Sequence, residues 1–181
     1  FAPVPITADF WVVPSWHEPP ENAQKVIRLD PGLALGTGTH PTTRMCLRWT
    51  AQQAPRLAPR WTRVLDYGCG SGILAIGAAL HGATHIDAVD IDPAAVDSTL
   101  ANARDNGVAL NAGLPDLARG QYSLVFANIL AMPLKLLAPL LCSHVAMGGD
   151  LVLAGILDRQ ADELKAAYAP WLALRVSDTE D

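Results

Sequence analysis

The chain has 181 residues, half of them hydrophobic and 17% of them charged, with a formal net charge of −5 at pH 7. This length favours one domain with a core of ordinary size, and the composition is that of a globular protein, not a disordered one. The acidic balance argues against a surface that binds nucleic acid over its whole area, and no hydrophobic run reaches the roughly 18 residues of a membrane span. We therefore expect no direct nucleic-acid contact and no membrane insertion, while a basic protein partner is compatible with the charge.

The cysteines and histidines give no sign of a metal site. Cys46, Cys69 and Cys142 are an odd and scattered set, and the histidines lack the spacing of metal ligands. No secretory signal is visible. Free thiols suit a reducing compartment, so the sequence predicts a cytoplasmic protein without a metal ion.

Residues 1–41 are rich in proline, which argues against helices in this segment. Two hydrophobic runs, at 10–13 and 26–29, predict short strands within an extended linker segment. Pro41 suits the first position of a helix, because proline lacks the N–H that a helix start leaves unpaired. This helix is expected to end near Gln53.

From residue 63 onward, strand patterns alternate with helix patterns. Such alternation implies right-handed crossovers, so we expect an α/β fold with a doubly wound, mostly parallel sheet. In such sheets ligands bind beyond the carboxyl ends of the strands. The expected strands are 63–66, 85–89, 108–111, 122–127, 149–154 and 171–176, and the expected helices are 72–81, 93–106, 131–146 and 158–168.

A glycine-rich turn joins the first of these strands to its helix. It reads Asp66-Tyr67-Gly68-Cys69-Gly70-Ser71-Gly72, and glycines let a backbone approach a ligand without interference from Cβ. A dinucleotide fingerprint would need glycine at position 73, which is Ile73. The turn resembles instead the S-adenosylmethionine loop of Rossmann-like methyltransferases, which implies cofactor contacts by Asp66, Gly68 and Gly70.

An acidic residue follows the next strand. Asp90 comes about 20 residues past the loop, where a carboxylate can accept hydrogen bonds from both ribose hydroxyls. Asp92 and Pro93 suit the N-cap and the first position of a helix that stops at Gly107. Asp90 is therefore a further predicted cofactor contact.

Two more stretches narrow the class. One is Leu29–Thr43, which contains Gly-Thr-Gly-Thr-His, and the other is Asn128-Ile129-Leu130-Ala131, directly after the fourth strand. With the glycine-rich turn, they resemble PrmA, a bacterial family of methyltransferases that act on a large-subunit ribosomal protein. The resemblance runs from Phe10 to about residue 155. It implies S-adenosylmethionine as methyl donor, with lysine side chains and an N-terminal α-amine of a basic ribosomal protein as acceptors.

The resemblance also implies a domain organisation. The family carries a separate N-terminal recognition domain and a further strand at the end of its sheet. We therefore expect 1–41 to be a linker segment and 42–181 to be the methyltransferase catalytic domain, without the recognition domain and without that last strand. The residues that the resemblance places against the cofactor are Thr43, Gly68, Asp90 and Asn128.

Methyl transfer from a sulfonium needs alignment of donor and acceptor, and it needs no covalent nucleophile. The accepting amine must be neutral, and desolvation beside the sulfonium lowers its pKa. Asn128 is the candidate catalytic residue, because its carbonyl oxygen can accept from the amine and its amide can donate. The alternative is a turn residue that closes a strand.

The Gly-Thr-Gly-Thr-His segment is a candidate lid over the site. Thr37 is a predicted cofactor contact within it, although threonines here could also be helix caps. His40 could assist deprotonation of the amine, or it could order the loop. Cys69 is interpreted as a small loop residue rather than a reactive thiol.

Three functions stay open at this point. The first is methylation of lysine and N-terminal amines of a ribosomal protein. The second is methylation of a small molecule or an RNA, because many enzymes with different substrates share the cofactor half of the fold. The third is binding of S-adenosylmethionine without catalysis. A nicotinamide dehydrogenase is disfavoured by Ile73.

Overall fold

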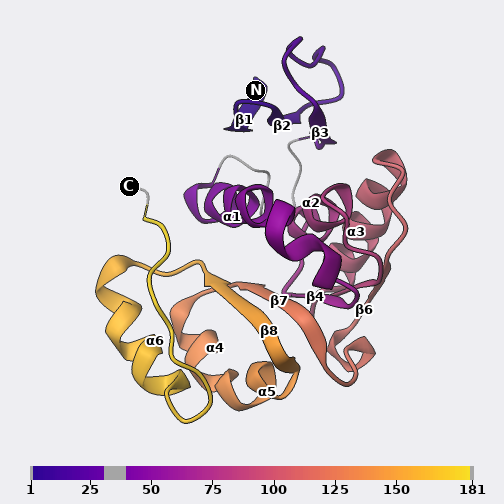
Figure 1. The fold of residues 1–181 in the computed structure, drawn as a ribbon. Helices are drawn as coiled ribbons and strands as arrows, with labels where there is room; N and C mark the ends of the chain where they lie inside the picture. Colours follow the sequence, from indigo (N-terminus) through magenta and orange to yellow (C-terminus); the bar gives the residue numbers. More distant parts are fainter. Residues whose placement is uncertain (1, 31–39, 180–181) are drawn as a thin grey trace.

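A computed structural model describes residues 2–30 and 40–179 of the chain (Figure 1). Its main sheet has five strands, and every neighbouring pair is parallel. The strand order is β6-β5-β4-β7-β8, so the order reverses at β4, where the chain passes from one half of the sheet to the other. The strands are β4 (Val64–Tyr67), β5 (Ile86–Val89), β6 (Asn111–Gly113), β7 (Tyr122–Asn128) and β8 (Val145–Ala154).

Helices cover both faces of this sheet, which confirms the predicted doubly wound α/β fold (Figure 1). Successive residues of a strand point to opposite faces, so Val64 joins one core and Leu65 the other. One face carries α1 (Pro41–Leu57), α2 (Ile73–Leu80) and α3 (Pro93–Asp105), and the other carries α4 (Ala131–Leu136), α5 (Ala138–Ser143) and α6 (Ala161–Tyr168). Short 3-10 turns occupy Ala58–Arg60, Pro115–Leu117 and Asp158–Gln160.

The N-terminal residues form a second, three-stranded sheet. It consists of β1 (Val4–Thr7), β2 (Phe10–Val13) and β3 (Lys25–Arg28), with β2 and β3 parallel. Phe10 and Ile27 are buried in the same core as Leu47 of α1 and Ile76 of α2. The expected linker segment therefore contributes core side chains, and the domain boundary after residue 41 stays a prediction.

Some expected elements differ only at their ends, since α1 ends at Leu57 and not near Gln53, and β8 begins at Val145 and not at 149. Three others differ more. The helix expected at 131–146 is two helices, because Pro139 has no N–H to continue the ladder, and the chain becomes β8 from Val145. The strand expected at 108–111 begins only at Asn111, because the Val108 N–H closes the end of α3 on the Ala103 carbonyl at 2.9 Å.

The third difference lies at the C-terminal end of the described chain. The segment expected as a strand at 171–176 forms no strand, and residues 172–179 run without regular structure alongside β8 toward α1 (Figure 1). A strand requires a partner for its backbone hydrogen bonds, and no described residue pairs with this segment in a ladder. Among residues 2–30 and 40–179, no helix has the length and hydrophobicity of a membrane span.

Candidate functional site

Four of the predicted site residues, Gly68, Gly70, Asp90 and Asn128, lie at the carboxyl ends of β4, β5 and β7. The glycine loop, residues 68–72, follows β4, and its Gly68 and Cys69 N–H groups donate to the Val89 carbonyl of β5 at 2.8 and 2.9 Å. Asp90 follows β5, and Asn128 ends β7. Because these strands are parallel neighbours, their ends meet at the same edge of the sheet.

Two glycines of the loop have no room for a side chain. A Cβ added at Gly68 would lie 2.7 Å from the Ile129 Cγ2, and one added at Gly72 would lie 2.7 Å from the Thr99 Cγ2. Both residues also have positive φ, of 80° and 83°, which side chains disfavour. Ile129 therefore packs directly against the loop and links it to the neighbouring Asn128.

Helix α3 holds the loop from the side. The Thr99 hydroxyl donates to the Gly70 carbonyl at 3.0 Å, and the Asn102 side-chain amide donates to the Ser71 carbonyl at 2.8 Å. Sequence reasoning missed both residues. Their spacing of three places them on one face of a helix, and that was the available signal.

Asp90 is engaged with the backbone through both carboxylate oxygens. Its Oδ2 accepts from the Gly70 N–H and its Oδ1 from the Asp92 N–H, both at 3.0 Å. A carboxylate has about four acceptor positions, so these two bonds leave capacity for a ligand. Asp92 caps α3 as predicted, since its Oδ1 accepts from the Ala94 N–H at 2.9 Å.

Asp66 lies beneath the loop and is only 1% exposed. Its Oδ2 accepts a hydrogen bond from the Ala75 N–H, at 3.2 Å, in the first turn of α2. Burial raises the pKa of this carboxyl to about 7, and the nearby Asp90 adds to the increase, while the hydrogen bond from Ala75 opposes it. Contact between Asp66 and a cofactor stays a prediction.

Asn128 and Thr43 lie side by side. The Asn128 side-chain amide donates to the Thr43 hydroxyl at 3.2 Å, which joins the end of β7 to the first turn of α1. Thr43 is buried, and Asn128 is partly exposed. The structure thus brings together the residues that the sequence predicted from two separate stretches.

His40 caps the start of α1. Its Nδ1 accepts from the Thr42 N–H at 3.3 Å and lies 2.8 Å from the Thr42 hydroxyl. This geometry gives His40 a structural role at the start of α1, and its predicted roles in ordering the loop and in deprotonation stay predictions. Thr37 and the rest of the candidate lid at 31–39 lie outside the described residues.

Two buried thiols near the site are held in the protonated form. Burial raises the pKa of Cys46 and of Cys69 to about 12, and the charge of Asp66 adds to both increases. The Cys69 Sγ lies 3.3 Å from the Thr99 hydroxyl. A protonated thiol is a poor nucleophile, which agrees with the interpretation of Cys69 as a loop residue.

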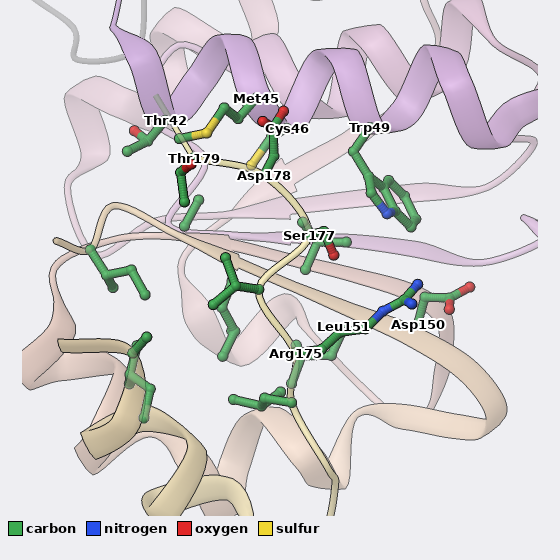
Figure 2. Close-up of a pocket in the computed structure, with 18 of the residues that line it drawn as sticks. Thr42, Met45, Cys46, Trp49, Asp150, Leu151, Arg175, Ser177, Asp178 and Thr179 are labelled. Atoms are coloured by element: carbon green, nitrogen blue, oxygen red, sulfur yellow. The ribbon is translucent and has the colours of Figure 1, made fainter. Parts of the chain in front are cut away.

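A cavity of about 600 Å³ lies between α1, β8 and residues 172–179 (Figure 2). Met45, Cys46 and Trp49 of α1 face it, and the Arg48–Asp178 ion pair at 2.7 Å ties the C-terminal segment to α1 beside it. Its lining begins at Thr42 and includes neither the glycine loop nor Asp90. The cavity therefore extends to the carboxyl end of β8 at Ala154, the register partner of Asn128, and sequence reasoning did not foresee it.

The full length of the chain, residues 1–181, matches the model of a protein family described as ribosomal protein L11 methyltransferase (PrmA). The chain belongs to this family. Members of it include the ribosomal protein L11 methyltransferase of Polaromonas sp., which is 71% identical over 181 residues, 100% of this chain and 60% of that protein. The Bordetella parapertussis protein of the same name is 54% identical over 187 residues, 97% of this chain and 60% of that protein.

The chain spans about 60% of the length of these L11 methyltransferase relatives. A solved structure in the family, the ribosomal protein L11 methylase of Lactobacillus delbrueckii subsp. bulgaricus, aligns with a TM-score of 0.81 at 33% identity. The alignment covers 94% of this chain and 88% of that one. A putative SAM-dependent methyltransferase from Streptococcus mutans aligns at 0.59 with 12% identity, covering 72% of this chain and 39% of that one, and shares the fold.

Proposed function

We propose that the chain binds S-adenosylmethionine and is the catalytic part of a methyltransferase that modifies ribosomal protein L11. One observation carries the proposal. In a chain of this family, the glycine loop, Asp90 and the Asn128–Thr43 pair meet at one edge of the sheet. This is the edge where parallel α/β sheets bind ligands, at the point where the strand order reverses.

The residues at this edge suit the proposed cofactor. The loop backbone carries no side chain at Gly68 and Gly70, so a ligand can approach it closely. Asp90 retains acceptor positions for the two ribose hydroxyls. Asn128 and Thr43 would face the methionine end of the cofactor, on the opposite side of the loop from Asp90.

The chemistry requires alignment more than reactive side chains. The bound cofactor would supply a methyl group on a positively charged sulfur, and an amine would attack that carbon in line with the breaking bond. The Asn128 carbonyl oxygen can accept a hydrogen bond from a neutral amine and so orient its lone pair. The nearby thiols of Cys46 and Cys69 are buried and protonated, so they need play no part in the transfer.

The acceptors we propose are lysine side chains and the N-terminal α-amine of protein L11. We propose that the methyl transfer takes place in the cytoplasm. The names of the relatives support L11 as the substrate. The net charge of −5 is compatible with a basic protein partner. Transfer to an amine needs alignment and no nucleophilic side chain, so it fits a site whose proposed catalytic side chain is the Asn128 amide.

The test is incubation of the chain, and of a version extended to the length of its relatives, with labelled S-adenosylmethionine. Each reaction would contain purified L11, ribosomal RNA or a metabolite extract. We expect label in L11, and more of it with the longer version, because a recognition domain would raise the local concentration of the acceptor. Label confined to RNA or metabolites, or no label from either version, would contradict the proposal.

A further inference from the structure

Helix α2 begins at a residue that has no side chain to accept from its first N–H groups. Gly72 occupies the N-cap position, and a side chain there is excluded both by its φ of 83° and by Thr99. Serine, threonine, aspartate and asparagine are the usual caps because their side chains accept from the first N–H groups. At this helix those N–H groups need acceptors other than a cap side chain, which another residue, water or a ligand can supply.

Asp66 supplies one such acceptor from the neighbouring strand. Its Oδ2 accepts from the N–H of Ala75, the third residue of α2, and both residues are buried. We infer that the ionised carboxylate of Asp66 is a positioning residue, which holds the start of α2 and thereby the glycine loop in the conformation that receives the cofactor. The inference deepens the proposed function and rests on it.

The surroundings of Asp66 make its ionised form costly. Three titratable groups interact electrostatically with Asp66: Asp90 at the end of β5 raises the pKa of Asp66, and the charge of Asp66 raises the pKa of Cys46 of α1 and of Cys69 of the loop. None of these three carries a positive charge. Burial and Asp90 therefore raise the pKa of Asp66 to about 7, so both protonation states are populated near neutral pH.

The two states differ as caps. A carboxylate accepts a stronger hydrogen bond from an N–H than a protonated carboxyl does, and the positive end of a helix favours a negative charge. If the ligand binds only the ionised form, apparent affinity follows the ionised fraction. With a pKa of about 7, that fraction falls about tenfold between pH 8 and pH 6.

The experiment is a calorimetric titration of the chain with S-adenosylhomocysteine at pH 6, 7 and 8. We expect affinity to fall about tenfold from pH 8 to pH 6. Asp66→Asn retains a neutral acceptor and should bind with nearly the same affinity throughout this range. Asp66→Asn with the pH profile of the wild type would overturn the inference.

Asp87→Asn is the matched control. Asp87 is also a buried carboxyl of the central sheet, but its hydrogen bonds come from the Tyr122 hydroxyl at 2.7 Å and the Asn111 side-chain amide at 3.1 Å, both outside the glycine loop. This variant should retain the pH profile of the wild type. A flat profile in Asp87→Asn as well would mean that any change in buried charge abolishes the effect, which would also overturn the inference.

A second measurement needs no variant. Binding that favours the ionised form must release protons at pH 7, and titrations in buffers with different ionisation enthalpies count them. Binding without proton release would overturn the inference while leaving the proposed function intact. Absence of binding at every pH would overturn the proposed cofactor, and the inference with it.

Discussion

The side-chain amide of Asn128 donates a hydrogen bond to the Thr43 hydroxyl at 3.2 Å, although 85 positions separate the two residues in the chain. Thr43 comes from the stretch that opens α1, and Asn128 comes from the end of β7. This bond fixes the orientation of the Asn128 amide, and so it directs the Asn128 carbonyl oxygen that we propose aligns the amine.

The first prediction concerns this pair. Thr43→Val removes the hydroxyl, and we expect turnover to fall by about 2- to 10-fold, the effect of one hydrogen bond of roughly 0.5–1.5 kcal/mol. Asn128→Ala should lower turnover further, and more than it lowers affinity for S-adenosylhomocysteine, because alignment acts in the transition state. Steady-state kinetics and calorimetry measure the two quantities.

Thr50→Val is the control for this prediction. Thr50 lies on the same helix, is buried, and donates to the Cys46 carbonyl within α1. Loss of the Thr50 hydroxyl should change the free energy of unfolding and leave turnover nearly unchanged. Equal losses of turnover in both threonine variants would show that the helix, and not the contact with Asn128, is responsible.

The second prediction concerns Asp90. Asp90→Ala should weaken binding of S-adenosylhomocysteine by about 1.5–3 kcal/mol, the scale of hydrogen bonds to a charged group. It should also lower the melting temperature, because the Gly70 and Asp92 N–H groups lose their acceptor. Asp92→Ala removes only the cap of α3 and should cost about 1 kcal/mol of stability with little change in affinity. Unchanged affinity in folded Asp90→Ala would remove Asp90 from the site.

The third prediction separates the two roles of His40. Asparagine is a good N-cap and a poor base, so His40→Asn should keep most of the turnover if His40 serves α1 alone. His40→Ala should lower stability by about 0.5–2 kcal/mol. Melting curves and the pH dependence of turnover measure these effects. A loss of turnover that is equally large in both variants would assign the imidazole to deprotonation.

The fourth prediction concerns one of the two tightly packed glycines of the loop. Gly72→Ala would place a Cβ 2.7 Å from the Thr99 Cγ2 at a φ of 83°, whereas Gly107 has a φ of 65° and open space around it. Gly107→Ala should therefore cost only the backbone penalty of about 1–2 kcal/mol. Gly72→Ala should cost more than this and should also weaken S-adenosylhomocysteine binding. Similar melting temperatures for the two variants would show that Thr99 moves aside freely.

Local patterns predicted the loop, Asp90 and Asn128 correctly as positions at strand ends, because a strand, a glycine turn and a helix can each be recognised within a short window. The supports of the loop could not be predicted in this way. Thr99, Asn102 and the bond from Ala75 to Asp66 depend on which elements become neighbours in space. Contact of these residues with the cofactor remains a prediction.

The misplaced elements have a similar cause. Residues 171–176 alternate like a strand, yet strand formation depends on a partner, and the segment has none among the described residues. Pro139 by itself indicates a break between two helices near Leu137, because proline cannot continue the backbone hydrogen bonds of a helix. The hydrophobic pattern across 131–146 instead predicts one continuous helix. Pro55 shows why this weighting is difficult, since α1 continues through it to Leu57.

The last prediction is the effect of pH on stability through Asp66. Its pKa is raised from 3.8 to about 7 in the folded chain, so between these values the folded state binds more protons than the unfolded state. The contribution of Asp66 to the free energy of unfolding is therefore largest below pH 4 and is lost as the pH rises through about 7.

Asp66→Asn removes this dependence on pH. We therefore expect the variant to have a higher melting temperature than the wild type at pH 8, and this advantage should shrink toward pH 5. Calorimetric melting of both proteins across this range measures the difference. An Asp66→Asn variant that is less stable than the wild type at pH 8 would mean that the hydrogen bond to Ala75 outweighs the cost of burying the charge.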